Sequence, residues 1–61
     1  MTKEQHDLAA HMIEALEHPS EELTSWETNF YESVSDQFER KGWLSDRQLK
    51  ILERIYAEKT A

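Results

Sequence analysis

Five basic side chains between residues 40 and 54 have the types and spacing to contact phosphate groups or an acidic protein surface. Arg47, Lys50 and Arg54 recur at i, i+3 and i+7, so a helix would place them on one side. Arg40 and Lys41 stand at the end of the preceding segment. In helix-turn-helix proteins a second helix enters the major groove while neighbouring bases hold phosphates, so direct nucleic-acid binding is one hypothesis for this stripe.

The same stripe also fits a helix face that meets only solvent. Lys50 with Glu53, and Arg54 with Glu58, have the spacing of intrahelical ion pairs, each of which contributes about 0.2–0.5 kcal/mol. Because side-chain spacing alone rarely identifies a binding helix, we favour the solvated face and keep nucleic-acid contact as the alternative.

Carboxylates dominate the rest of the chain and offer a second functional interpretation. Glu27, Glu32, Asp36 and Glu39 fall in one predicted helix, and further acidic residues precede them. A row of carboxylates can imitate the phosphate backbone and so capture a protein that normally holds nucleic acid. The interpretation we favour is simpler: an acidic helix surface keeps a small domain in solution.

Four further polar side chains are of types that can bind a metal ion. Asp7, His11, Glu14 and His18 recur at i, i+4, i+7 and i+11 in the first helix. Such a stripe extends about 16 Å along a helix axis, so its four members cannot surround one ion. Only an adjacent pair, or pairs from two subunits, could bind a metal. We expect a solvated stripe and no metal.

The sequence lacks the residues that most catalytic motifs need. It has no cysteine to act as a nucleophile, and its single glycine rules out a Gly-rich phosphate loop. None of its serines stands in the Gly-x-Ser-x-Gly context of a nucleophile elbow. We therefore expect a protein without enzymatic activity and without a cofactor.

Cap and breaker residues predict three helices, at residues 3–17, 25–41 and 46–58. Each should begin with a capping box, in which a Gln or Glu follows the cap by three positions; the caps are Thr2, Thr24 and Ser45. Pro19 ends the first helix, and Gly42 ends the second in the left-handed conformation. Because the last two helices are only about four residues apart, they should form a tight hairpin or corner. A frayed tail is expected at Lys59, Thr60 and Ala61.

Each helix has one apolar face at helical spacing, and these faces predict the core. The core candidates are Leu8, Ala9, Met12, Ile13 and Leu16, then Trp26, Phe30, Val34 and Phe38, and finally Leu49, Ile51, Leu52, Ile55 and Tyr56. Trp43 differs because it follows Gly42 in the turn. It either clamps the helix corner or stays partly exposed as an anchor for a partner, and we favour the clamp.

The charge of this 61-residue chain is −6 and is unevenly distributed. Residues 1–39 hold ten acidic residues and one basic residue, whereas residues 40–61 hold six basic and three acidic residues. A chain this short makes one domain with a thin core. It has neither a membrane-spanning apolar run nor the apolar segment of a signal peptide, so we expect a cytoplasmic protein without membrane contact.

One segment resembles a stretch found in small phage, prophage and mobile-element proteins. It reads Trp26-Glu27-x-x-Phe30-x-x-Ser33-Val34-x-x-Gln37, then Gly42-x-Leu44-Ser45-x-x-Gln48-x-x-Ile51-Leu52-x-x-Ile55-Tyr56, and it covers roughly residues 23–58. Such segments often accompany functions in DNA metabolism. The resemblance implies an accessory or host-modulating protein of phage type.

These observations together predict an all-α protein with a single domain over residues 1–61. The last two helices would form a tight hairpin, and the first would pack across it or be exchanged within a homodimer. The predicted function is a non-enzymatic module that binds a protein partner in nucleic-acid processing; its contact residues would be Arg40, Lys41, Trp43, Arg47, Lys50 and Arg54. Direct nucleic-acid binding by residues 46–58 and an acidic inhibitor of a host DNA-binding protein are the alternatives.

Overall fold

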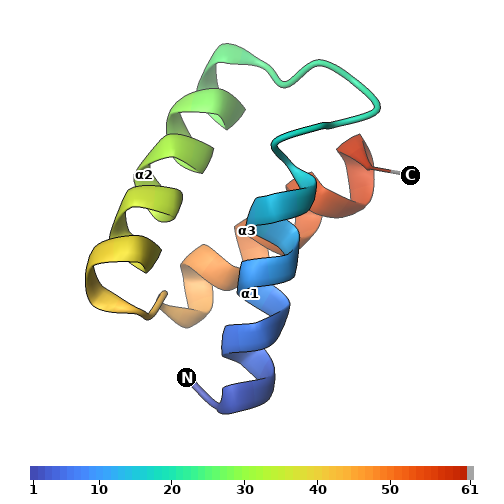
Figure 1. The fold of residues 1–61 in the computed structure, drawn as a ribbon. Coiled ribbons are helices and arrows are strands. Elements are labelled where there is room, and N and C mark those ends of the chain that lie inside the picture. The colour runs from blue at the N-terminus through green and yellow to red at the C-terminus, as the bar shows by residue number, and fades with distance from the viewer. Residues whose placement is uncertain (61) are drawn as a thin grey trace.

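Three helices account for most of the chain in the computed structural model, which describes residues 1–60 (Figure 1). They are α1 (Lys3–Ala15), α2 (Ser25–Lys41) and α3 (Asp46–Lys59). The predicted all-α class is confirmed, and α2 has the predicted bounds. Across residues 1–60, no helix combines the length and the apolar character needed to cross a lipid bilayer.

All three predicted capping boxes are present. In the box of α2, the Glu27 amide donates to Thr24 Oγ1 at 3.1 Å, and the Thr24 amide donates to Glu27 Oε1 at 2.8 Å. The boxes of α1 and α3 have the same two-way geometry. Gly42 ends α2 with φ 75°, in the left-handed region where a residue without a Cβ atom is favoured. Local sequence signals therefore set the helix ends.

Two predicted helix ends differ from the observed ones by one or two residues. α1 ends at Ala15 rather than at residue 17 because its last turn tightens. There the Glu17 amide donates to the Glu14 carbonyl and the His18 amide to the Ala15 carbonyl, both at 3.2 Å. α3 continues one residue beyond its predicted end, to Lys59.

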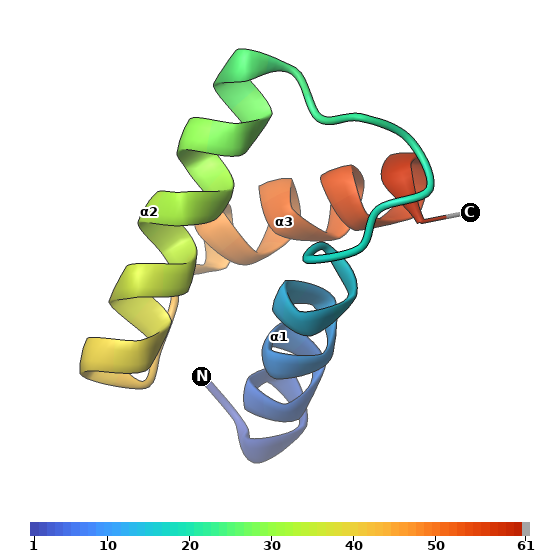
Figure 2. The same ribbon diagram turned by 45° about the horizontal axis from the view of Figure 1, so that its top comes forward.

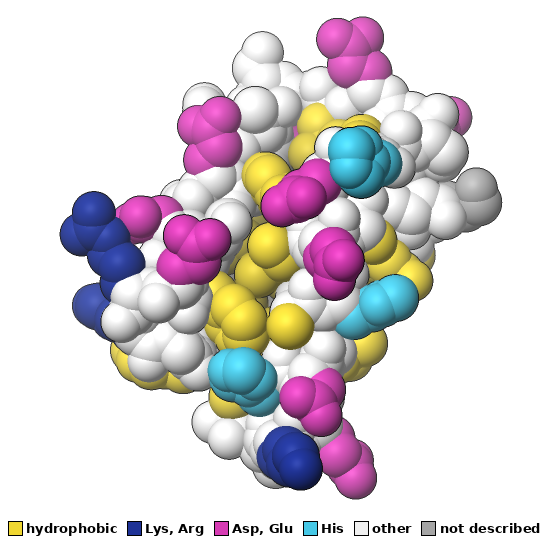
Figure 3. All heavy atoms as spheres, in the orientation of Figure 1, with side chains coloured by type: hydrophobic (Ala, Val, Ile, Leu, Met, Phe, Trp, Pro, Cys, Tyr) yellow, Lys and Arg dark blue, Asp and Glu magenta, His cyan; other side chains and the backbone are white. Residues whose placement is uncertain are grey.

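The helices are arranged so that the backbone of α3 approaches both of the others, whereas the backbones of α1 and α2 approach each other less closely. Figures 1 and 2 show α2 and α3 diverging from the short turn at residues 42–45, while residues 16–24 span the open end. Apolar side chains are visible in the gap between α1 and α2 (Figure 3). The predicted hairpin is thus a corner that opens toward the start of α2.

The core is small and comes mainly from α1 and α3. Its buried apolar residues are Ala9, Met12, Leu16, Val34, Leu44, Leu49, Leu52 and Ile55. Val34 is the one apolar residue of α2 that is fully buried. The prediction that Leu8 is a core residue is wrong, since 41% of its surface is exposed. Leu8 lies on the flank of α1, beside the stripe that faces α3.

Lys59 has a structural role that contradicts the predicted frayed tail. Its backbone carbonyl accepts hydrogen bonds from the Ser20 amide at 2.6 Å and from Ser20 Oγ at 2.7 Å. Its ammonium group lies 3.6 Å from Glu27 Oε1, and only 17% of the Lys59 side chain is exposed. Lys59 therefore ties the end of α3 both to the linker between α1 and α2 (residues 16–24) and to the start of α2. Ala61, also assigned to the tail, lies outside the described residues.

Leu52→Ala should destabilise the fold severely. Leu52 is fully buried, and removing such a side chain typically costs about 2–5 kcal/mol, a large part of the stability of a domain this small. Leu8→Ala is the matched control, because the same truncation at a largely exposed helix position should change stability by about 0.5 kcal/mol or less. Urea denaturation followed by circular dichroism measures both. Equal losses in the two variants would contradict the described core.

Candidate protein-binding surface

The first turn of α2 holds Trp26 in an exposed position. Trp26 lies between Thr24 and Glu27, whose capping box fixes the backbone of this turn. Its indole stacks on the ring of Phe30, with ring centroids 5.4 Å apart and an interplanar angle of 8°. The prediction that Trp26 belongs to the core is wrong, because 60% of its surface is exposed.

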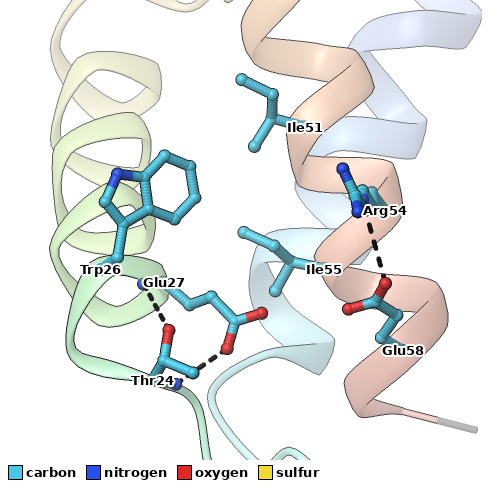
Figure 4. A pocket seen from close by; sticks show the side chains of 7 residues that line it. All are labelled: Thr24, Trp26, Glu27, Ile51, Arg54, Ile55 and Glu58. Carbon is cyan, nitrogen blue, oxygen red and sulfur yellow. Dashed lines mark hydrogen bonds and ion pairs between the residues drawn. The ribbon is translucent and has the colours of Figure 1, made fainter.

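Trp26 forms one wall of a cleft between α2 and α3 (Figure 4). The cleft has a volume of about 380 Å³. We call it the α2–α3 cleft; its lining residues are Thr24, Trp26, Glu27, Ile51, Arg54, Ile55 and Glu58. Figure 4 shows the indole facing Ile51 and Ile55 across the gap, with Arg54 on the α3 side. An aromatic face, two aliphatic side chains and a guanidinium group thus converge on one hollow.

The cleft exists because the backbones of α2 and α3 diverge from the turn, although the side chains of Glu27 and Lys59 still join the two helices at the other end. Near the turn, Gln37 and Gln48 hydrogen-bond through their side-chain amides in both directions, at 3.2 and 3.1 Å. Gln48 Oε1 also accepts from the Ser45 amide at 2.8 Å, so the same side chain caps α3 and joins it to α2. Farther from the turn the helices diverge, and Trp26 has the helical register of a core residue but no helix close enough to cover it.

Glu27 was predicted to be part of an exposed acidic row, and that prediction is wrong. Only 9% of the residue is exposed, and its carboxylate accepts from the Thr24 amide and pairs with Lys59. The hydrogen bond from the Thr24 backbone, assisted by the Lys59 charge, holds the pKa of Glu27 below its usual value although burial opposes this. Glu32, Asp36 and Glu39 are exposed as predicted.

The predicted basic residues are all exposed, but they belong to different local environments. Arg54 lines the α2–α3 cleft and lies 3.6 Å from Glu58, which confirms one of the two suggested intrahelical pairs. The other, Lys50 with Glu53, is not an ion pair among the described residues; both side chains instead line a separate hollow beside α1. Arg40 pairs with Asp36 at 3.1 Å.

The exposed fraction of Trp43 is 46%, which is larger than expected for a side chain packed over the helix corner. Its backbone carbonyl holds the turn, because it accepts a hydrogen bond from Gln37 Nε2 at 3.2 Å. Its ring is therefore the second exposed tryptophan of the molecule, consistent with the alternative interpretation as an anchor.

The histidines of α1 contact aromatic rings rather than each other. His11 Nε2 lies 3.2 Å from Tyr56 Oη, and the His6 ring is 4.6 Å from the ring of Phe38. In the part of the chain that the structure describes, no three His, Asp or Glu side chains cluster closely enough to hold a metal ion. Asp7 and Glu14 are exposed on α1, and His18 is exposed just after it.

Comparison with known proteins found no matching family model, curated protein or solved structure. Sequence patterns had indicated Arg54 but not the cleft around it. Ile51 and Ile55 were recognised as apolar positions, yet their place opposite Trp26 depends on how far α2 and α3 diverge, for which the local pattern carries no signal.

Glu27→Gln should remove part of the acid sensitivity of folding. Because the pKa of Glu27 is lowered by folding, its ionised carboxylate stabilises the protein above about pH 4.3, and this contribution is lost as pH falls through the lower folded pKa. Wild type should therefore be more stable than the variant at pH 7, with the difference shrinking below about pH 4.

Glu32→Gln is the control for that experiment, because it removes the same charge from an exposed site. Its stability should run parallel to that of wild type from neutral to acidic pH. Thermal unfolding at a series of pH values measures all three proteins. If Glu27→Gln also runs parallel to wild type, the carboxylate does not have the role that its contacts with Thr24 and Lys59 indicate.

Proposed function

We propose that this protein is a cytoplasmic, non-enzymatic binding module, a phage-type accessory or host-modulating protein that contacts a component of nucleic-acid processing through its protein surface. The observation that carries the proposal is the α2–α3 cleft, in which an exposed tryptophan faces two isoleucines beside an arginine. The setting in nucleic-acid processing rests on the resemblance of residues 23–58 to phage-type segments.

The composition of the cleft is that of a binding hot spot. Tryptophan and arginine are enriched among the residues that contribute most to protein–protein affinity. Trp26 keeps 60% of its surface exposed, and covering that area would contribute about 2–4 kcal/mol. The stack on Phe30 holds the indole in place beforehand, so little conformational entropy is lost when a partner binds.

Arg54 supplies the polar contact of the proposed site. Its pair with Glu58 is largely exposed, with 80% and 55% of the two side chains accessible, and such pairs contribute little to stability. A carboxylate from a partner can therefore replace Glu58 at small cost, in a setting that the Trp26 ring and the partner would shield from water. The remaining predicted contact residues are exposed, as a binding surface requires; they are Arg40, Lys41, Trp43, Arg47 and Lys50.

Trp26→Ala should weaken partner binding strongly while leaving the fold intact. The side chain is mostly exposed, so its removal should hardly affect stability, whereas an affinity loss of about 2 kcal/mol or more lowers binding at least about thirtyfold. Quantitative affinity purification from the native cell, followed by binding measurements with the purified partner, tests this. The expected partner is a protein of nucleic-acid processing.

Leu8→Ala is the control, because it truncates another exposed apolar side chain away from the cleft. Binding should survive this change, and circular dichroism should show native helix content in both variants. Partner binding that is unchanged in Trp26→Ala would contradict the proposed surface. A partner without any role in nucleic-acid processing would contradict the proposed setting.

Direct nucleic-acid binding by α3 is the second candidate, favoured by the exposure of Arg47, Lys50 and Arg54 along one side of the helix. It would give an affinity for duplex DNA or RNA that falls with salt, with a log–log slope of about −2 to −3 for three phosphate contacts. Arg47→Ala would make that slope shallower by about one. We expect no such binding at low salt, because the whole protein carries a charge of −6 and repels phosphate. Fluorescence anisotropy with labelled duplexes distinguishes the two candidate functions. A salt-dependent affinity with this slope would favour direct nucleic-acid binding.

A further inference from the structure

A second hollow lies on the other side of α2, between that helix, the end of α1 and the linker. Its volume is about 440 Å³, and we call it the α1–α2 groove. Its apolar lining includes Leu16, Leu23 and Tyr31, and its carboxylates are Glu17, Glu22 and Glu32. It shares no lining residue with the α2–α3 cleft. The two hollows can therefore be altered independently.

The groove lies where residues 16–23 lead from the end of α1 toward the start of α2. Figure 3 shows a strip of apolar side chains between these two helices, with Asp and Glu side chains around it. Tyr31 is fixed as part of the groove, since its hydroxyl donates to the Ile13 carbonyl across the gap at 3.1 Å. Leu16 is buried beneath, so the apolar floor is continuous with the core.

Carboxylates reach the groove from both walls. Glu17 follows α1, Glu22 lies in the linker and Glu32 belongs to α2, and all three are exposed. Burial raises the pKa of Tyr31, and the charges of Glu17 and Glu39 raise it further. Among the residues that line the groove there is no Lys or Arg.

We propose that the α1–α2 groove binds a basic amphipathic helix of a partner protein. Apolar side chains of that helix would rest on Leu16, Leu23 and Tyr31, while its Lys or Arg residues would lie toward the flanking carboxylates. The charge of −6 steers a cationic segment toward the molecule and opposes the approach of nucleic acid or an acidic surface. The proposal does not depend on the α2–α3 cleft.

A helical occupant suits the groove because its α2 wall cannot pair with an extended peptide. The backbone amides and carbonyls of Thr28, Tyr31 and Glu32 are already paired within α2, whereas the other wall is formed by residues 16–23. A segment that satisfies its own backbone and offers apolar side chains at i, i+3, i+4 and i+7 matches such a groove. A second folded copy does not supply it, because the apolar face of its own basic helix, α3, is already buried in the core through Leu49, Leu52 and Ile55.

Three synthetic peptides of about four helical turns test the proposal by isothermal titration calorimetry. The first has a Leu stripe flanked by Lys, the second has Glu in place of Lys, and the third is a scrambled form of the first without an apolar face. Only the first should bind appreciably, with a gain in helix content seen by circular dichroism. Equal binding of the scrambled or the acidic peptide, or binding without helix formation, would overturn the proposal.

Two double variants locate the site. Glu17→Gln with Glu32→Gln should weaken binding of the basic peptide about fivefold, because two charge pairs at the groove are lost. Asp7→Asn with Glu53→Gln makes the same change in net charge away from the groove and should leave affinity nearly unchanged at physiological salt, where distant charges are screened. An equal loss of affinity for the basic peptide in the two double variants would overturn the assignment of the site.

Nuclear magnetic resonance distinguishes this surface from the α2–α3 cleft. The basic peptide should shift the ring signals of Tyr31 and leave the indole signal of Trp26 in place. A shift confined to Trp26 would put the peptide in the cleft and overturn the inference. Sedimentation equilibrium provides the remaining check, since self-association that Glu17→Gln with Glu32→Gln abolishes would assign the groove to a second copy.

Discussion

The position of α2 depends on the contacts that Lys59 makes at the end of α3. Lys59 holds Ser20 through its carbonyl oxygen and Glu27 through its ammonium group, while Gln37 and Gln48 join the same two helices near the turn. Val34 is the one apolar side chain that α2 buries completely, while Phe30, Tyr31 and Phe38 pack against the core only partly buried, so the polar contacts supplement this packing. The Glu27 carboxylate also accepts from the Thr24 amide, which compensates the cost of removing it from water.

A helix that is held at its two ends keeps its flanks open. On one flank of α2 the indole of Trp26 faces Ile51 and Ile55 (Figure 4), and on the other the ring of Tyr31 lies among carboxylates. Both hollows have an apolar floor. The charged residues of the first include a guanidinium group as well as carboxylates, whereas those of the second are all carboxylates. The two flanks therefore suit partners of different charge, and the uneven charge of the sequence reappears as a difference between neighbouring surfaces.

Features that depend on a few neighbouring residues could be predicted from the sequence, and features that depend on the distance between helices could not. Thr24, Ser45 and Gly42 mark helix ends because their partners lie within four residues. Trp26 has the register of a core residue and is exposed, because no local pattern records where α3 diverges from α2. The pairing of Lys59 with Glu27 joins positions 32 residues apart in sequence, and both residues had been given other roles.

The same distinction bears on what the patterned segment over residues 23–58 can indicate. Its polar residues have structural partners: Glu27 binds Thr24 and Lys59, and Gln37 binds Gln48 and the Trp43 carbonyl. Val34, Leu44, Leu52 and Ile55 lie in the core. Trp26 is different, because stacking on Phe30 does not require an indole that remains 60% exposed. A fold that needed only an apolar residue at this position would be satisfied by a smaller one, so the exposed indole is the feature of the segment that a binding function explains better than stability does.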